Sequence, residues 1–241
     1  MRQVTAPALT GASYSANIDL MAADTTDVAG YDFLRIFMPR EIRLAQRQAM
    51  LQSSKSSDGE PSSALGIYLV RLEPIEGDWF PASAEGGSQI GDHIQEILNE
   101  VIRDSDIPAR LSDREHLAIL RDLDPDQTFV VSQRFLSSAS ESDLLRAANL
   151  RACVGYIIYP LSSQPNHPPQ QWEKIIELAR VMSQYGESTG RASGNGLLRG
   201  PSMAEAGIPE SDLIPLAIRD PDGLVKVGML QIQKIHLIPA L

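Results

Sequence analysis

The chain has 241 residues, of which 31 are acidic and 21 basic, so its formal net charge is -10. A hydrophobic fraction of 43% suffices for a globular core, and no apolar run approaches the roughly 18 residues of a membrane span. The acidic balance argues against a general nucleic-acid-binding protein, which needs a basic surface. The N-terminus also lacks the basic and apolar segments of a signal peptide. We therefore expect a cytoplasmic protein with no nucleic acid and no membrane among its partners.

The first half of the chain predicts a helix, a strand and a second helix. Residues 27–50 have a helical pattern that Pro39 interrupts, which indicates a kinked helix or two short ones. Residues 65–72 are typical of a buried strand, and residues 77–91 of a loop. The next segment has an apolar stripe and predicts a helix over 92–103, through Ile94, Ile97, Leu98, Val101 and Ile102.

The second half begins with a predicted hairpin around 111–120, followed by a helix that starts near Pro125. A central strand over 152–159, an amphipathic helix over 172–185 and a strand-like run over 224–238 complete the chain. The order helix, strand, helix, hairpin, helix, strand, helix indicates an α/β (α+β) fold. Its central sheet should be mostly antiparallel and flanked by helices.

The usual catalytic constellations are absent from the sequence. It has no phosphate-binding G-x-x-x-x-G-K-[ST] loop, no G-x-G-x-x-G and no nucleophile elbow. The single cysteine, Cys153, excludes an internal disulfide, and its position within a strand indicates a core residue. The four histidines lie far apart and are interpreted as structural or solvent-facing: His93, His116, His167 and His236. We expect neither catalytic residues nor a bound metal or cofactor.

One cluster of motifs is more informative. Arg103 and Asp106 form R-x-x-D at the end of a helix, five residues follow, and the pentapeptide 112–116 (SDREH) comes next. This arrangement resembles the GGDEF family of diguanylate cyclases, in which R-x-x-D precedes the G-G-D/E-E-F turn of a β-hairpin by the same spacing. The resemblance implies a nucleotidyl-cyclase palm domain.

Further segments match the family in order and spacing. They are the G-x-x-I-G-D of residues 87–92, the strand 69–75, the strand 152–160, the helix leading into residues 187–191, and the D-V-A-G of residues 27–30. The resemblance covers residues 24–199. We therefore divide the chain into an N-terminal tail (1–23), a degenerate GGDEF-like domain (24–199) and a C-terminal extension (200–241).

The departures from the family decide the expected activity. Family cyclases join two GTP molecules with two divalent cations, and Arg71 and Arg114 stand here at the positions of the carboxylates that hold them. Ser112 and Asp113 replace the two turn glycines, and Glu187 replaces a lysine expected to meet the triphosphate. The family residues that remain at the degenerate active site are Asp92, Glu115 and Arg191, with His116 ending the signature. We therefore predict no cyclase activity.

Two interpretations of the arginines stay open. Arg71 and Glu73 share one face of a strand, so Arg71 could simply neutralise a lost site. Alternatively, Arg71 and Arg114 could hold a nucleotide phosphate directly, as guanidinium groups do well.

The R-x-x-D pair corresponds to the family's inhibitory site, which binds cyclic di-GMP. An arginine binds the O6/N7 edge of guanine bidentately, and a carboxylate accepts from its N1–H and amino group. Arg134 lies 22 positions after Ser112, where the family supplies a second arginine. We therefore expect cyclic di-GMP at Arg103, Asp106 and Arg134, although a solvated ion pair, or Asp104 as the partner of Arg103, would also fit.

The leading hypothesis is an inactive GGDEF domain that acts as a cyclic di-GMP receptor. The two-fold symmetry of the ligand suits a homodimer, and an unidentified protein would read the signal. The alternatives are a GTP-binding module without catalysis and a protein-interaction scaffold. In the scaffold, residues 52–64 and 200–241 would carry the partner surfaces, and the extension could pack on the domain, reach a second subunit or bind a partner.

Overall fold

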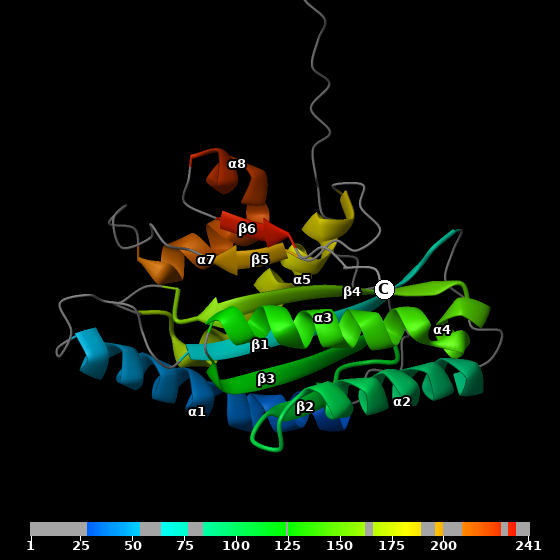
Figure 1. The fold of residues 1–241 in the computed structure, drawn as a ribbon. Helices are drawn as coiled ribbons and strands as arrows, with labels where there is room; N and C mark the ends of the chain where they lie inside the picture. The colour runs from blue at the N-terminus through cyan, green and yellow to red at the C-terminus, as the bar shows by residue number, and fades with distance from the viewer. Residues whose placement is uncertain are drawn as a thin grey trace, which may run out of the picture.

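The computed structural model describes residues 28–53, 64–76, 84–123, 125–161, 166–188, 196–199, 209–227 and 231–234. Their centre is a six-stranded sheet in the order β2-β3-β1-β4-β5-β6. Helices cover both faces of this sheet (Figure 1). The predicted α/β fold with a mostly antiparallel central sheet is confirmed.

Strand β1 (Ala64–Pro74) is the middle of the sheet, paired antiparallel with β3 (Glu115–Leu123) and with β4 (Leu150–Tyr159). The edge strand β2 (Ile107–Arg110) completes the predicted hairpin with β3. On the other side, β5 (Gly196–Arg199) runs parallel to β4, and β6 (Gln231–Lys234) pairs antiparallel with β5. The predicted strands over 65–72 and 152–159 and the predicted hairpin around 111–120 are therefore confirmed as β1, β4 and the β2–β3 pair.

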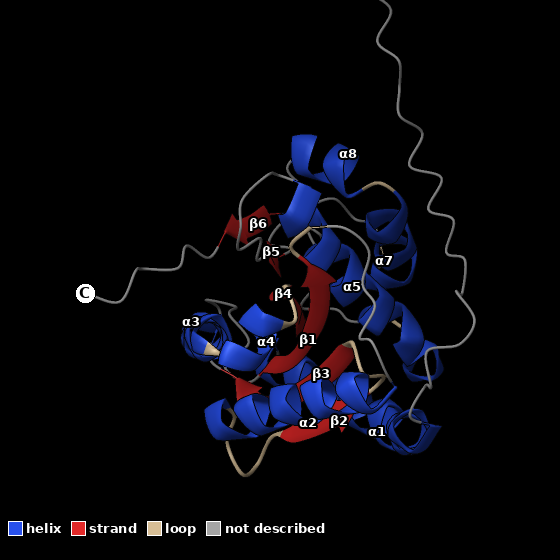
Figure 2. Ribbon diagram, turned by 90° about the vertical axis from the view of Figure 1, so that its right-hand side faces the viewer, coloured by secondary structure: helices blue, strands red, loops and turns tan. Residues whose placement is uncertain are grey.

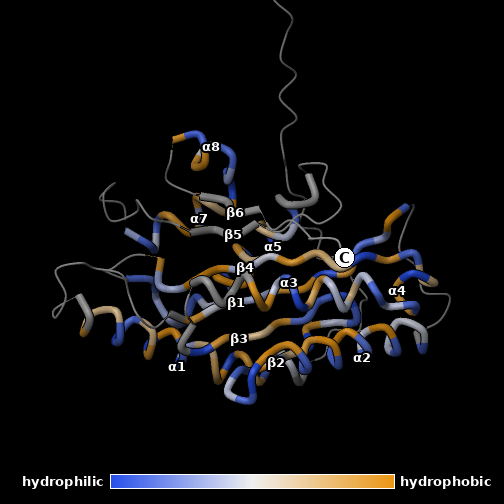
Figure 3. The backbone as a smooth tube through the Cα atoms, in the orientation of Figure 1, coloured by the Kyte–Doolittle hydropathy of each residue, from blue (hydrophilic) through white to orange (hydrophobic). Residues whose placement is uncertain are grey.

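Alternate residues of β1 serve two separate cores, as the period of two in a strand requires. Ile67 and Leu69 pack with α1 (Val28–Ser53) and α5 (Trp172–Ser188). The intervening residues of β1 pack with α2 (Ala84–Val101) and α3 (Pro125–Glu141). Figure 2 shows α3 and the short α4 (Asp143–Ala147) on one side of the sheet and α5 on the other. In Figure 3 the hydrophobic residues concentrate along the central strands.

Helix α1 continues through Pro39 from Val28 to Ser53 as one helix, so the alternative of two short helices is wrong. Proline removes one backbone hydrogen bond, but it does not remove the apolar face on either side of it. That face stays buried along the whole helix and consists of Leu34, Met38, Ile42, Ala45 and Ala49. Packing of this face therefore outweighs the loss of the hydrogen bond.

Helix α2 begins at Ala84, so residues 84–91 are helical and not the predicted loop. The three glycines in this segment, Gly86, Gly87 and Gly91, are typical of a loop, but Ile90 is buried on the same face as Ile94. A Cβ at Gly91 would lie 2.4 Å from the Arg110 guanidinium, the end of a flexible side chain that would have to shift. The helix ends at Val101, two residues earlier than predicted.

The C-terminal extension packs on the domain through α7 (Glu210–Arg219) and α8 (Pro221–Lys226). Leu213, Ile214, Ala217 and Leu224 are buried in the same core as α1 and α5. The predicted strand over 224–238 is wrong for its first residues, because Asp220 accepts from the N–H of Gly223 and caps α8. Within the described part of this run, β6 is the strand. No helix in the described ranges has the length and apolar character needed to cross a bilayer.

Candidate functional site

The R-x-x-D motif forms the turn between α2 and β2. The backbone N–H of Asp106 donates to the carbonyl of Arg103 at 2.9 Å, and the N–H of Arg103 donates to Asp106 Oδ2 at 2.9 Å. The other oxygen of Asp106, Oδ1, accepts from the N–H of Arg121 on β3 at 3.0 Å. Asp106 is buried, so its carboxylate holds the turn and anchors it to the sheet.

This role of Asp106 was not foreseen from the sequence. A carboxylate oxygen has two lone pairs, so each oxygen keeps one acceptor position after its contact with the backbone. The motif therefore combines a fixed acidic residue with an exposed arginine: Arg103, like Asp104, lies at the surface of the turn.

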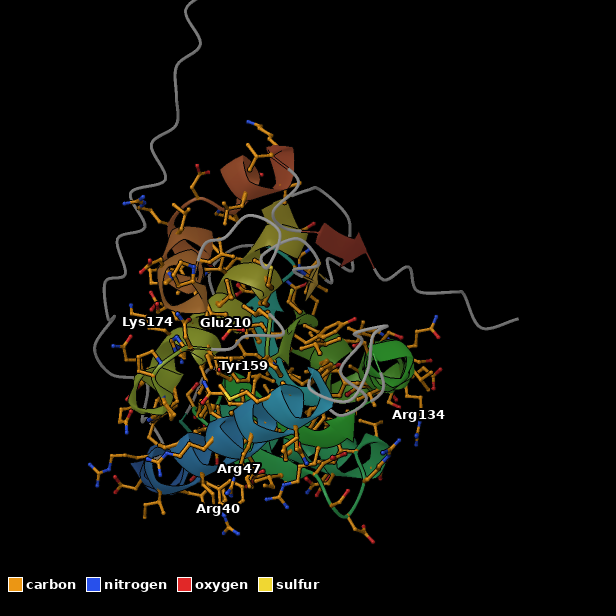
Figure 4. All side chains as sticks on the ribbon, turned by 90° about the vertical axis from the view of Figure 1, so that its left-hand side faces the viewer. Arg40, Arg47, Arg134, Tyr159, Lys174 and Glu210 are labelled. Carbon is orange, nitrogen blue, oxygen red and sulfur yellow. The ribbon has the colours of Figure 1, made fainter. Side chains whose placement is uncertain are left out.

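Arg134 reaches this turn from the neighbouring helix α3. Its Nη2 donates to the carbonyl of Glu100 at 3.4 Å. Glu100 is in the last turn of α2, three residues before Arg103 in the chain. Figure 4 shows Arg134 at the edge of the molecule, away from Arg40 and Arg47 on α1. The structure thus brings Arg134 to the end of α2 that carries Arg103.

The degenerate signature forms the turn between β2 and β3. The Ser112 hydroxyl accepts from the N–H groups of Arg114 and Glu115, each at 3.1 Å. The carbonyl of Glu115 accepts from the N–H of Leu111 at 2.8 Å, which closes the turn. Ser112 therefore stabilises this turn with its side chain, at a position where the family resemblance implied a glycine.

A pocket of about 340 Å³ lies beside this turn, at the ends of β1 and β3. Its lining includes Arg71, Glu73, Arg114 and Glu115. Arg71 and Glu73 form an ion pair within the pocket, as their shared strand face allows. This contact agrees with the interpretation in which Arg71 neutralises the site.

Glu115, the retained acid of the signature, is bound by Arg180 from α5. The Nε of Arg180 lies 3.0 Å from each carboxylate oxygen, and its Nη2 also donates to the Tyr31 hydroxyl at 2.7 Å. Burial by itself would lower the pKa of Arg180, but the charge and hydrogen bonds of Glu115 outweigh it and raise that pKa. Arg180 therefore stays charged and occupies the carboxylate.

Asp92, which the family resemblance implied at the degenerate active site, also has an arginine partner. Arg110 donates to Asp92 Oδ1 at 2.5 Å and to the carboxylate of Asp113. Burial opposes the charge on Arg110, yet the hydrogen bonds of Asp113 and Asp92 raise its pKa above the usual value. The guanidinium thus bridges two carboxylates beside α2.

His116 lies under this bridge with its Nδ1 3.1 Å from Gln95 Oε1. Burial, and then the positive charge of Arg110, lower the pKa of His116 to about 3. His116 is therefore neutral at neutral pH. It is a buried residue that packs in the interior of the protein.

The implied pair of divalent cations does not fit these residues. Arg71 and Arg114 stand at the ligand positions, and the nearby carboxylates Glu73 and Glu115 each bind a guanidinium group. Mg²⁺ requires oxygen ligands, and an arginine offers only donors. Within the described residues no group of three or more metal-ligating side chains comes together.

The remaining candidates from the sequence have structural surroundings or lie outside the described residues. Cys153 is buried in the sheet, as predicted. His93 Nε2 lies 2.8 Å from the Ser142 hydroxyl, and His167 Nε2 lies 2.9 Å from the Gln171 carbonyl. Arg191 and His236 lie outside the described residues.

Arg110 and Arg180 are the residues of this region that the sequence analysis missed. Arg110 is three residues from Asp113, a spacing that could have suggested an ion pair. Arg180 is separated from Glu115 by 65 positions, and no local pattern signals that contact.

No protein-family model and no curated protein sequence matches the chain. Solved structures similar to the chain include a domain from Caulobacter crescentus in complex with c-di-GMP. The two sequences are 13% identical, the match covers 67% of this chain and 89% of that chain, and the TM-score is 0.48. The similar structures are GGDEF domains. Another, from Pseudomonas aeruginosa, has 15% identity, covers 71% and 91% of the two chains and has a TM-score of 0.46. The active GGEEF domain of a diguanylate cyclase from Vibrio cholerae has 12% identity, covers 66% and 94%, and has a TM-score of 0.44.

The motifs of the sequence resemble the same family as these solved structures, whose TM-scores lie below 0.5. At such identities the similarity concerns the course of the chain. The chemistry of the site therefore has to be argued from the side chains described above.

Proposed function

We propose that this protein is a non-catalytic receptor for cyclic di-GMP, which binds at the turn after α2 through Arg103, Asp106 and Arg134. The observation that carries the proposal is the approach of Arg134 to the end of α2, where it contacts the carbonyl of Glu100 at 3.4 Å. One arginine from this turn and one from α3 therefore lie at the end of α2. A ligand with two guanine bases and two phosphates suits such a pair, because guanidinium groups recognise both.

The position of Asp106 supports this use of the turn. Its two backbone contacts hold the carboxylate in place before a ligand arrives, so less ordering accompanies binding. Its remaining lone pairs are suited to the N1–H and amino group of guanine. A dimer joined by the two-fold symmetric ligand, and a protein that recognises the bound state, belong to the same proposal.

We propose the absence of cyclase activity because of the charges at the positions where the family resemblance implied metal ligands. Arg71 and Arg114 supply positive charge where two cations would have to bind, and Arg180 occupies the carboxylate of Glu115. A phosphoryl transfer that depends on divalent cations has no ligands to hold them there.

A second candidate is GTP binding without catalysis in the arginine-lined pocket. Its volume of about 340 Å³ and the presence of Arg71 and Arg114 in its lining favour it. This candidate and the first use different residues, so variants separate them.

The test is titration calorimetry of the full chain with cyclic di-GMP and, separately, with GTP. Arg103→Ala and Arg134→Ala each remove a proposed contact, whereas Arg146→Ala removes an exposed arginine of α4 as a matched control. We expect cyclic di-GMP to bind the wild type and the control, and binding to fall at least about tenfold in the other two variants. Incubation with GTP and Mg²⁺ should yield no cyclic di-GMP.

Three results would contradict the proposal. Binding of cyclic di-GMP that is unchanged in Arg103→Ala would place the ligand elsewhere. Binding of GTP alone, lost in Arg114→Ala, would establish the second candidate. If neither nucleotide binds, the protein is a scaffold of the kind considered from the sequence.

A further inference from the structure

The outer face of α1 combines arginines with exposed hydrophobic side chains. We define this face by Phe33, Ile36, Arg40, Arg43, Leu44 and Arg47, which follow one another at helical spacing on the side opposite the buried stripe. Ile36 is 78% exposed, and Phe33 and Leu44 are 42% and 41% exposed. A soluble domain normally shows such side chains singly, so their alignment on one face indicates a contact surface.

Among the described residues, no acid pairs with the arginines of this face. Arg40, Arg43 and Arg47 are exposed, and none of the three has an ion pair with a residue in the described ranges. The two acids of the helix are engaged elsewhere: Asp32 pairs with Arg35, and the buried Glu41 binds Arg121 at 2.8 and 3.0 Å. In a chain whose net charge is -10, this face is a local positive region.

A hollow of about 260 Å³ adjoins the outer face of α1. Its lining includes Arg40 and Leu44, and also Glu41, whose carboxylate holds the Arg121 guanidinium, so Arg40 is the cation that it offers next to apolar surface. The Arg121 guanidinium also lies 5.1 Å from the centre of the Phe37 ring, which orients it at this place. A phosphate group with an attached acyl chain would match both parts of this surface.

We propose that the outer face of α1 is a contact surface for anionic phospholipid at the surface of a membrane. Negative headgroups attract the three arginines, and each guanidinium binds phosphate bidentately. Phe33, Ile36 and Leu44 would enter the boundary between headgroups and acyl chains. This peripheral contact departs from the expectation, drawn from the sequence, that no membrane is among the protein's partners.

The position of the arginines favours this occupant over a protein. Arg40, Arg43 and Arg47 lie along the middle of the face, so a dry protein interface would have to desolvate all three. At a headgroup layer they stay hydrated while their aliphatic stems lie on apolar surface. A second copy of the chain is disfavoured because it would place three arginines against three arginines.

The surface is separate from the proposed nucleotide site. Figure 4 shows Arg40 and Arg47 on α1, with Arg134 on a different part of the molecule. The proposal rests on α1 and the hollow beside it, and it stands whether or not cyclic di-GMP binds.

The test is co-sedimentation of the full chain with vesicles of phosphatidylcholine, with or without phosphatidylglycerol. The variant replaces Arg40, Arg43 and Arg47 with glutamine, and the control replaces Arg146, Arg219 and Lys226, which are exposed on other helices. We expect wild type and control to sediment only with phosphatidylglycerol. The variant should partition about 100-fold more weakly, since each basic residue near an anionic surface contributes about fivefold.

Two further variants keep the test informative. Arg40→Lys, Arg43→Lys and Arg47→Lys together should retain most of the binding, because lipid attraction depends on charge. Ile36→Ser with Leu44→Ser should weaken it through lost apolar contact. Circular dichroism establishes that each variant is folded.

Three results would overturn the proposal. They are no binding of wild type to phosphatidylglycerol vesicles, equal binding of wild type and the glutamine variant, and a glutamine variant whose oligomeric state by light scattering differs from that of wild type. The last result would assign the face to contact between copies.

Discussion

Arg180 on α5 binds both carboxylate oxygens of Glu115 on β3, with its Nε 3.0 Å from each. The acid that the signature retains is therefore part of the packing between a helix and the sheet. Because Arg180 also donates to the Tyr31 hydroxyl, the contact joins α1, β3 and α5 at one point. Glu115 thus has Arg180 as a structural partner, in the turn where the family resemblance implied an active site.

Replacing Arg180 with methionine should lower the free energy of unfolding by about 2–4 kcal/mol, because Glu115 would be left partly buried without its partner. Urea denaturation followed by circular dichroism measures this. Arg146→Met, which breaks the exposed Arg146–Asp143 pair, is the control and should change stability by less than about 0.5 kcal/mol. Equal effects of the two variants would show that the Arg180–Glu115 contact adds no stability.

Arg103→Ala and Asp106→Ala should separate ligand binding from folding. Arg103 is exposed, so its removal should leave stability within about 0.5 kcal/mol while cyclic di-GMP binding falls. Asp106→Ala loses two hydrogen bonds to backbone N–H groups and should cost about 2–3 kcal/mol. Denaturation and calorimetry on the same preparations measure both quantities. An Asp106→Ala variant as stable as wild type would contradict the structural role of this carboxylate.

Arg71→Asp should create a site that responds to divalent cations. The new carboxylate would lie beside Glu73 and next to Glu115 on the paired strand, so the like charges lower stability until a cation binds. We expect Mg²⁺ or Mn²⁺ to raise the Tm of this variant by several degrees and to leave wild type unchanged. Differential scanning fluorimetry measures the shift, with Arg146→Asp as the control. An equal shift in all three proteins would indicate nonspecific stabilisation.

Gly155→Ala should destabilise the domain by about 2–4 kcal/mol. A Cβ at this position of β4 would lie 2.1 Å from the carbonyl oxygen of Ala179 and 2.4 Å from the N of Ser183. Both are backbone atoms of α5, so the helix itself would have to move. Urea denaturation measures the loss, and a variant with wild-type stability would mean that α5 lies further from the sheet.

His116 should make stability depend on pH in the acid range. Burial lowers its pKa to about 3, whereas the unfolded chain titrates near 6.5. The folded state is therefore favoured above pH 6.5 and loses about 1.4 kcal/mol for each pH unit below it, until the folded pKa is reached. His116→Gln should flatten the curve of unfolding free energy between pH 6 and 4, by the logic of the same linkage. Parallel curves for both proteins would show that other groups cause the acid sensitivity.

The sequence by itself determined the order of elements in the domain. The apolar pattern of residues 65–72, 152–159 and 172–185 was sufficient for two strands and a helix, because period two and period 3.6 are local properties. It also placed Arg103 and Asp106 on one turn, since they are three residues apart. It failed at residues 84–91 and 221–226, where glycine and β-branched residues suggested other structures than the helices that tertiary packing selects.

Only the tertiary structure decided which charges meet. Arg180 lies 65 positions from Glu115, Arg110 lies 18 positions from Asp92, and Arg121 lies 80 positions from Glu41. It also decided that α7 and α8 join the main core and that the outer face of α1 stays uncovered within the described residues. These contacts depend on the distances between packed elements, and a linear pattern of residues contains no record of those distances.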